Sequence, residues 1–221
     1  MKFITVRIIY TKAGKVRFIS HLDVVRALQR ALRRAQLPVA LSEGFSPHFQ
    51  ISYCQPLSLG VESECEFADV TFIQEIKDIK TDLIDVLNKV LPEGIVVKDA
   101  FLIDKNKAKS LKELSENVVF YTQIPVDFDF AQKRSVELKE GKIIVTRQRA
   151  EKQQIINIKD FLAGVKIKEE NGKIGVEFGL KPNEKGQSLS PYDFIKGFTG
   201  FENTESQNIQ IKKIRVGVVN E

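Results

Sequence analysis

The sequence passes from an extended segment into an amphipathic helix at Ser20, within residues 17–23 (Arg-Phe-Ile-Ser-His-Leu-Asp). Ser20 and Asp23 have the spacing of a capping box. In that motif the hydroxyl accepts the backbone N–H of residue 23, and the carboxylate reaches back to the N–H of residue 20. The pattern that follows predicts a helix over residues 21–35. Its apolar stripe consists of Leu22, Val25, Leu28 and Leu32.

A second stripe of the same helix consists of arginines spaced i, i+4, i+7 and i+8, namely Arg26, Arg30, Arg33 and Arg34. Four guanidinium groups on one face cannot be buried without partners, so this face meets water or something anionic. The helix has no acid after Asp23, and arginine binds phosphate through two parallel hydrogen bonds, so the stripe indicates a phosphate-binding face. The alternative interpretation is a solvated face whose long stems cover apolar surface.

A loop that contains glycine and proline follows Leu37-Pro38 and spans residues 42–49 (Ser-Glu-Gly-Phe-Ser-Pro-His-Phe). A rigid loop beside a helix N-terminus can cradle an oxyanion, although Gly44 and Pro47 also suit a tight turn of fixed shape. The predicted anion- or nucleic-acid-binding site has these members: Lys12, Arg17, His21, Arg26, Arg30, Arg33, Arg34, Ser42, Gly44, Phe45 and His48. The aromatic residues on which unpaired bases could stack are Tyr10, Phe18, Phe45, Phe49 and Tyr53.

The two histidines of the chain, His21 and His48, both belong to this region. Each is either a surface or packing residue or one half of a paired site that shuttles a proton, as in metal-independent cleavage of RNA. A Ser-His-Asp triad is excluded, because residues 20, 21 and 23 share one helical turn and point in different directions. No metal or cofactor is expected, since the spacing of the histidines with Cys54 and Cys65 matches no usual zinc pattern.

The basic residues are concentrated in one segment. The net charge of the chain is +5, and residues 1–42 hold nine bases against one acid, which leaves −3 for the remainder. This asymmetry favours a localised basic patch over charge that is spread across the surface and serves solubility. No apolar run approaches the ~20 residues of a membrane span, and residues 1–7 are typical of a strand and not of a signal peptide. We therefore expect a cytoplasmic protein with no membrane partner.

The first half of the chain has the element order strand, helix, strand, strand, helix, strand, which is the βαββαβ order of a ferredoxin-like domain. These elements are expected at residues 2–10, 21–35, 51–53, 64–73, 74–91 and 95–103, with a further short strand at 16–19. The second half is richer in strands. It contains a hairpin signal at Asn171-Gly172, a second capping box at Ser190 and Asp193, and a lesser basic turn with Arg147, Arg149 and Lys152, expected to be solvated.

These patterns together predict an α+β protein. Two ferredoxin-like subdomains would stand in tandem, at residues 1–105 and 106–221, and the second would be the more degenerate.

The segment from Lys12 to Glu66 resembles a bacterial family of uncharacterised proteins called radical-SAM-linked proteins. The likeness rests on a long ordered set of residues: Lys12, Gly14, the segment 17–23, Arg26, Arg30, Arg33, Arg34, Leu37-Pro38, Ser42, Gly44, Phe45, Pro47, His48, Pro56-Leu57, Gly60 and Glu62.

The resemblance implies a partner, a radical S-adenosylmethionine protein of the cobalamin-binding type that is encoded beside this chain or fused to it. It also implies a role in RNA metabolism with tRNA or rRNA, because ribonuclease G and ribosomal-protein genes belong to the family's neighbourhood. The chain is not itself the radical SAM enzyme, since its two cysteines are too few for the three thiolates of that cluster.

We therefore expect an accessory protein that binds RNA or presents a substrate. Two alternatives stay open: an interaction module for the radical SAM partner without nucleic acid, and a metal-independent nuclease that uses His21 and His48.

Overall fold

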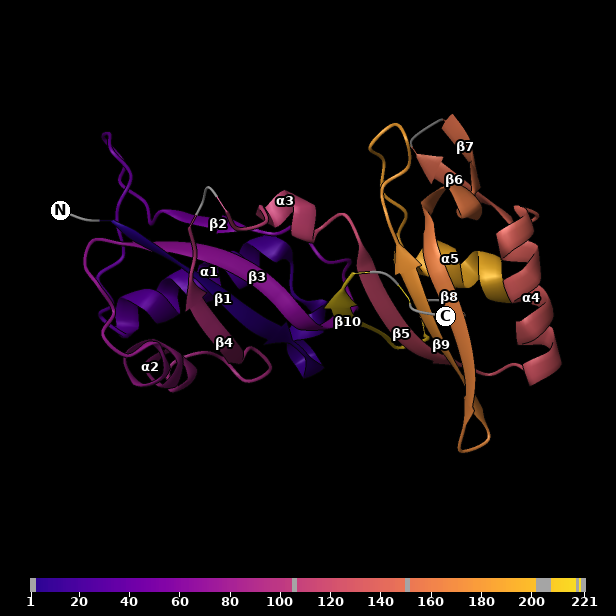
Figure 1. Cartoon of the computed structure of the whole chain (residues 1–221), viewed down its shortest axis with the longest axis horizontal. Helices are drawn as coiled ribbons and strands as arrows, with labels where there is room; N and C mark the ends of the chain where they lie inside the picture. Colours follow the sequence, from indigo (N-terminus) through magenta and orange to yellow (C-terminus); the bar gives the residue numbers. More distant parts are fainter. Residues whose placement is uncertain (1–2, 105–106, 150–151, 202–207, 218, 220–221) are drawn as a thin grey trace. The chain divides into compact units, whose positions relative to one another are not determined.

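The structure of the chain, a computed structural model, describes residues 3–104, 107–149, 152–201, 208–217 and 219. Helices and antiparallel strands are combined in two units, unit 1 (Met1–Ser115) and unit 2 (Glu116–Glu221) (Figure 1). The predicted α+β class is confirmed. Among the described residues, no helix is both long and apolar enough to cross a membrane.

Unit 1 is built on an antiparallel sheet with the strand order β4-β1-β3-β2. Its elements are, in chain order, β1 (Ile4–Lys12), the 3₁₀ helix η1 (Gly14–Phe18), α1 (His21–Arg34), β2 (Ile51–Tyr53), β3 (Glu62–Phe72), the π-helical turn η2 (Lys80–Ile84), α2 (Asp85–Asn88), β4 (Val97–Leu102) and α3 (Leu111–Leu114). The predicted order of strands and helices is therefore present, with η1 and α3 in addition.

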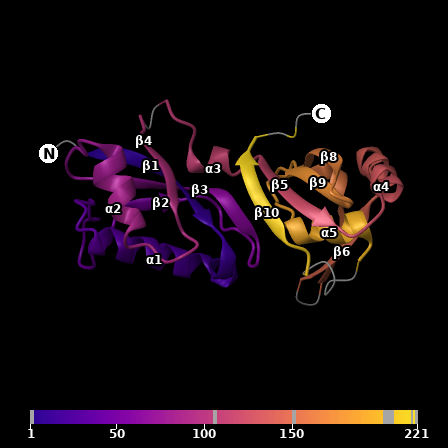
Figure 2. The same cartoon turned by 90° about the horizontal axis from the view of Figure 1, so that it is seen from below.

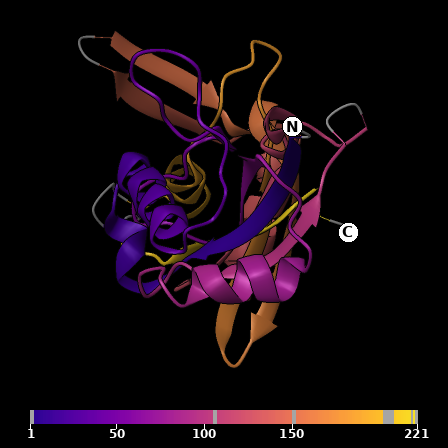
Figure 3. The same ribbon diagram turned by 90° about the vertical axis from the view of Figure 1, so that its left-hand side faces the viewer.

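The core of unit 1 lies between one face of this sheet and two helices. The register pairs Val6 with Val70 and Ile8 with Ala68, so these side chains share one face. Leu28 of α1 and the buried apolar residues of η2 and α2 belong to the same core cluster. Figure 3 shows the indigo helix α1 and the magenta η2–α2 helix on the same side of the unit 1 sheet.

Two predictions for the first half differ from the structure. Of the segment expected as a strand at 16–19, residues 16–18 belong to η1, because Gly14 takes a φ of +61° and donates its N–H to Glu62 Oε1 at 3.0 Å. The helix expected at 74–91 begins only at Lys80, where the carboxylate of Asp78 accepts the N–H groups of Lys80 and Thr81. The first difference depends on Glu62, a partner far away in the sequence, and the second on Asp78, whose carboxylate accepts N–H groups at the start of the helix.

The boundary between the units lies at residue 115, ten residues after the predicted one. The segment that carries α3 packs on unit 1, on the sheet face opposite α1. Arg7 of β1 donates from Nη1 to the carbonyl of Lys109 at 2.7 Å, and Cys54 Sγ donates to the carbonyl of Leu111 at 3.5 Å. These bonds attach residues 109–111 to the first unit.

In unit 2 four antiparallel strands follow the order β10-β5-β9-β8 (Figure 2), and β6 and β7 form a separate two-stranded ribbon. Its elements are β5 (Val118–Ile124), α4 (Phe128–Glu140), β6 (Ile144–Arg149), β7 (Lys152–Asn157), the 3₁₀ helix η3 (Ile158–Phe161), β8 (Leu162–Glu170), β9 (Lys173–Leu180), α5 (Pro191–Thr199) and β10 (Ile211–Val216). The predicted hairpin between β8 and β9 is confirmed, and Asn171 and Gly172 take φ values of +52° and +72°.

Phenylalanine rings fill the core of unit 2. Phe120 stacks on Phe178 with 5.4 Å between ring centroids, Phe178 on Phe194 at 3.9 Å, and Phe194 on Phe198 at 5.6 Å. Gly197 of α5 lets the helix approach β6 and η3 closely, because a Cβ at this position would overlap Ile158 and Val145. The stack joins the sheet to α5 and fixes that helix on its face.

Candidate nucleic-acid interface

The start of helix α1 is fixed by the predicted cap. Ser20 Oγ accepts the backbone N–H of Asp23 at 3.2 Å and donates its own proton to Asp23 Oδ2 at 2.7 Å. The hydrogen bond from the Ser20 hydroxyl is the main reason why the pKa of Asp23 is lowered, with the backbone of Ser20 and the guanidinium of Arg26 contributing in the same direction. The carboxylate is thereby kept charged at the positive end of the helix dipole.

The buried face of α1 is rotated from the predicted apolar stripe. Its fully buried residues are Val24, Leu28, Ala31 and Leu32, whereas Leu22 is 62% exposed. Leu28 and Leu32 were expected in the core and lie there; Leu22 was expected there and does not. Because the buried residues all face the sheet, the opposite face of the helix is left to the arginines.

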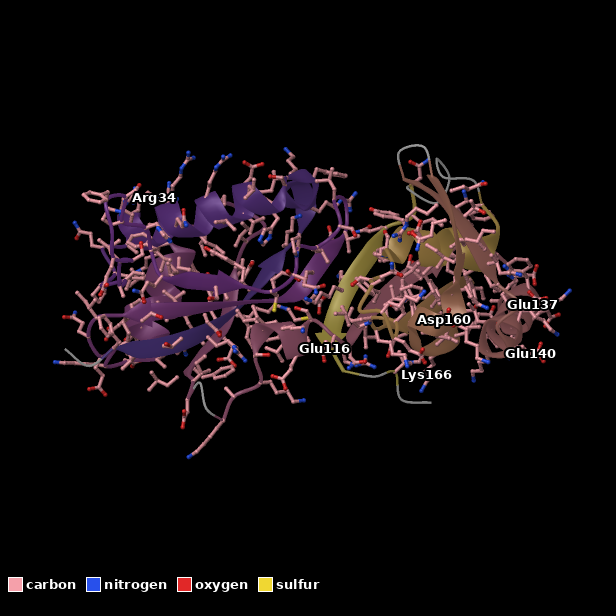
Figure 4. The ribbon with its side chains drawn as sticks, turned by 90° about the horizontal axis from the view of Figure 1, so that it is seen from above. Arg34, Glu116, Glu137, Glu140, Asp160 and Lys166 are labelled. Carbon is pink, nitrogen blue, oxygen red and sulfur yellow. The ribbon has the colours of Figure 1, made fainter. Side chains whose placement is uncertain are left out.

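All four arginines of the stripe have exposed side chains. Arg26 pairs with Asp23 at 3.2 Å, and Arg34 donates to the carbonyl of Val90 at 2.5 Å. Within the described part of the chain, Arg30 has no hydrogen-bond, ion-pair or ring partner. Figure 4 shows Arg34 on the outer side of α1, away from the sheet of unit 1. The row therefore stands open to an anion.

The loop at residues 42–48 is closed at its base. Ser42 donates its backbone N–H to the carbonyl of His48 at 2.8 Å, and His48 returns its own N–H to Ser42 Oγ at 3.1 Å. Ser42 Oγ also lies 2.9 Å from His48 Nδ1. Gly44 has a φ of +118°, and Phe45 next to it is fully exposed. Figure 3 shows the loop as a purple segment that stands out from unit 1.

The loop lies at the C-terminal end of α1. The guanidinium of Arg33, in the last turn of the helix, lies over the ring of Phe49 with 5.3 Å to the centroid. A cation over an aromatic face is a favourable contact, and it holds the end of the loop beside the arginine row. The predicted position of this loop beside the N-terminus of α1 is wrong.

Two of the predicted anion-binding residues are engaged inside the protein. Lys12 is 3% exposed and donates from Nζ to the carbonyl of Ile19 at 3.1 Å. Arg17 forms an ion pair with Glu62 at 3.4 Å, and its guanidinium lies over the ring of Phe18 at 4.6 Å. Lys12 is thus removed from the candidate surface, and the charge of Arg17 is largely compensated.

The structure does not bring the two histidines together. His21 is the first residue of α1 and contacts the ring of Tyr53 edge-on at 5.8 Å, whereas His48 precedes Phe49 at the other end of the helix. A helix of 14 residues is roughly 20 Å long, so the two imidazoles cannot act on one phosphate. The paired histidine site is therefore not formed, and a nuclease that relies on both imidazoles together loses its geometric basis.

The N-terminal end of α1 instead covers a polar cluster that the sequence did not reveal as a group. His21 lies near buried Lys12 and buried Glu66, and Ser63 Oγ donates to Glu66 Oε1 at 2.7 Å. Burial lowers the pKa of His21. The negative charge of Glu66 raises this pKa, and the positive charge of Lys12 lowers it. The sequence contained one signal for this cluster: Lys12 follows Tyr10 by two residues and so continues the apolar face of β1, which predicts a buried charge.

Tyr53 adds an unusual feature to this cluster. Its hydroxyl oxygen is buried and, among the residues that the structure describes, has no hydrogen-bond partner. Burial raises the pKa of the phenol, so the group stays protonated.

Neither the cysteines nor the second basic turn adds to the interface. In the described part of the chain, Cys54 and Cys65 form no disulfide, and no group of three or more His, Cys, Asp or Glu side chains is able to hold a metal. In unit 2, Arg147 forms an ion pair with Asp193 and is not solvated as expected. The side chains of Arg149 and Lys152 lie outside the part that the structure describes.

Comparisons with known proteins place the chain in a family. Residues 5–191 match the family model described as "Uncharacterized protein conserved in bacteria (DUF2344)". No match was found among curated proteins. Among solved structures, one described as "Crystal structure of putative glycine cleavage system transcriptional repressor" matches with 4% identity and a TM-score of 0.26, covering 100% of both chains. That similarity is too low to carry an argument.

Proposed function

We propose that this chain, which belongs to the DUF2344 family of uncharacterised proteins conserved in bacteria, binds RNA through the outer face of α1 as an accessory protein. The observation that carries the proposal is the open arginine row. Arg26, Arg30 and Arg33 all have exposed side chains on one helix face, and Asp23 is the one acid of that helix. Phosphate contacts from arginine supply most of the affinity in sequence-independent binding to nucleic acid.

The proposal includes the finer fold, two ferredoxin-like units in tandem. The strand order β4-β1-β3-β2 in unit 1, with every neighbouring pair antiparallel, supports it for the first unit. The order β10-β5-β9-β8 supports it for the second, in which the β6–β7 ribbon is an insertion after α4. Such tandems suit binding surfaces on exposed helices or loops, although the fold alone assigns no function.

A radical SAM protein of the cobalamin-binding type is the proposed partner, and the shared role would be modification or metabolism of tRNA or rRNA in the cytoplasm. The resemblance of the segment from Lys12 to Glu66 to radical-SAM-linked proteins supports this part of the proposal. In this arrangement the chain would hold or present the RNA, and the partner would supply the radical chemistry.

A second candidate function is docking to the radical SAM partner without nucleic acid. It is favoured by apolar side chains exposed near the start of α1: Phe18 is 60% exposed, Leu22 62% and Leu59 60%. The backbone N–H of Gly60, next to Leu59, donates to the carbonyl of Arg17 at 2.9 Å, which brings the three side chains into one neighbourhood. Exposed apolar patches of this kind mark protein-binding surfaces.

The test of the RNA proposal is binding to tRNA measured against salt concentration. The double variant Arg30→Gln/Arg34→Gln should bind more weakly and lower the slope of log K against log salt by about 1.4–1.8, because two phosphate contacts are lost. The control is Lys98→Gln/Lys112→Gln, which removes the same charge from exposed residues of β4 and α3. If both double variants change the slope equally, the α1 face is not the contact.

The test of the second candidate is copurification with the radical SAM partner. A complex that survives nuclease treatment and is weakened by Leu22→Ser, but not by Arg30→Gln/Arg34→Gln, supports protein docking through the apolar residues. A complex that dissociates on nuclease treatment contradicts direct docking and favours a shared RNA.

A further inference from the structure

We infer that the RNA bound by this chain contains unpaired nucleotides, one of which stacks on Phe45. The inference rests on the proposed function and specifies its substrate class. Of the five aromatic residues that the sequence brings near the basic segment, Phe45 alone is fully exposed. Tyr10 is buried, and the rings of Phe18 and Phe49 each lie under a guanidinium, of Arg17 and Arg33 respectively.

The position of the ring at the tip of a closed loop suits a stacking platform. Ser42 and His48 hold the base of the loop through one backbone–backbone hydrogen bond, one backbone–side-chain hydrogen bond and one side-chain contact, and Gln50 Nε2 donates to the carbonyl of Leu41 at 3.0 Å. A loop held in this way loses little further entropy when a base is bound. Because the ring of Phe45 is fully exposed, a base can stack on it without displacing another side chain.

The neighbouring charge indicates that the ring, and not an ion pair, makes the contact at the tip. Glu43 is exposed on the loop, two residues before Phe45, and would repel a phosphate placed there. The phosphates are instead accommodated by the arginine row, which meets the loop where Arg33 covers Phe49. A strand whose backbone follows α1 can therefore reach Phe45 with a base at the end of the row.

This geometry distinguishes single-stranded from duplex RNA. The faces of bases inside a helix are covered by their stacked neighbours, so an aromatic side chain reaches a base face only in loops, bulges, ends and single strands. Arginine contacts to phosphate carry no such distinction, because both forms display phosphates. Phe45 is consequently the residue that would select unpaired nucleotides.

The experiment measures the affinity of the full chain for a single strand of roughly 12 nucleotides and for the duplex with its complement. Phe45→Ala should weaken binding of the single strand by about 5- to 150-fold, the equivalent of one lost stacking contact, and leave the salt slope unchanged. Phe45→Leu should lose nearly as much, because it keeps apolar area but not the planar face, whereas Phe45→Tyr should bind like the wild type. The control Phe101→Ala removes a ring that is 41% exposed on β4, on the face away from α1, and should change nothing.

The outcomes separate this inference from the proposed function. If wild type binds both RNA forms equally and Phe45→Ala binds the single strand like wild type, the stacking inference is overturned, and the arginine face stands. If Phe45→Leu binds like wild type, the contact is apolar and not a stack, which also overturns it. If no RNA binding depends on Arg30 and Arg34, the proposed function itself fails.

Discussion

The ion pair between Arg7 and Asp69 offers the sharpest test of how unit 1 is held together. The pair is bidentate, with Nε 2.7 Å from Oδ1 and Nη2 2.9 Å from Oδ2, and the side chains are 5% and 14% exposed. Removing one partner leaves the other charge buried and uncompensated, so Asp69→Leu or Arg7→Met should each cost about 3–5 kcal/mol. Replacing both, as Arg7→Met/Asp69→Leu, should cost far less than the sum, because neither charge then remains.

The free energy of unfolding in urea, followed by circular dichroism, gives the coupling energy of the pair. Hydrogen exchange should place the loss in the amides of β1 and β3, and also in α3, because Arg7 Nη1 holds the carbonyl of Lys109. A matched cycle on the exposed pair of Asp23 and Arg26 should give a much smaller coupling energy, because solvent screens that pair. Additive losses at Arg7 and Asp69, or single losses no larger than those of the exposed pair, would refute this account.

Three further predictions concern α1 and α5. Burial lowers the pKa of His21 from its ordinary value of 6.5, so at a pH between the folded-state and the unfolded-state pKa the folded chain binds fewer protons than the unfolded chain. Stability should therefore fall as the pH drops through this window. The Tm of His21→Gln should lack this part of the pH dependence. Gly197→Ala should cost about 1–3 kcal/mol in urea unfolding, because its methyl group would overlap Val145, and a variant as stable as wild type would contradict the close packing. Ser20→Ala should cost about 1 kcal/mol and Ser20→Gly only a few tenths, whereas equal losses would argue against the hydroxyl cap to Asp23.

Local signals predicted the elements that depend on their own residues. The cap at Ser20 and the turn at Asn171-Gly172 were both readable, because each needs only neighbours in the sequence. The 3₁₀ helix η1 was missed, since its first residue Gly14 is held by Glu62, a partner 48 residues away. No local pattern contains that information.

The candidate site divides in the same way. The exposure of the arginine row followed from the helical period and from the cost of burying guanidinium groups. Which apolar residues of α1 face the core could not be predicted in the same way. Leu22 and Val24 are both apolar and both lie in the first turns of the helix, and only packing against the sheet buries Val24 and leaves Leu22 exposed. Likewise, the charge of Lys12 suggested a surface residue, but its register opposite Ser63 on β3 places it in the interior.

Helix α1 joins two chemically different environments within unit 1. At its start, His21, Lys12 and Tyr53 form an enclosed polar group, in which burial shifts each pKa toward the neutral form. At its end, Arg33 and the loop that carries Phe45 face water. A phosphate must give up part of its hydration to bind, and the exposed side chain of Arg30 can replace that hydration without first breaking an internal bond. The enclosed group has no such freedom, so recognition of a large polyanion belongs to the C-terminal half of the helix, and the N-terminal half fixes the helix on the sheet.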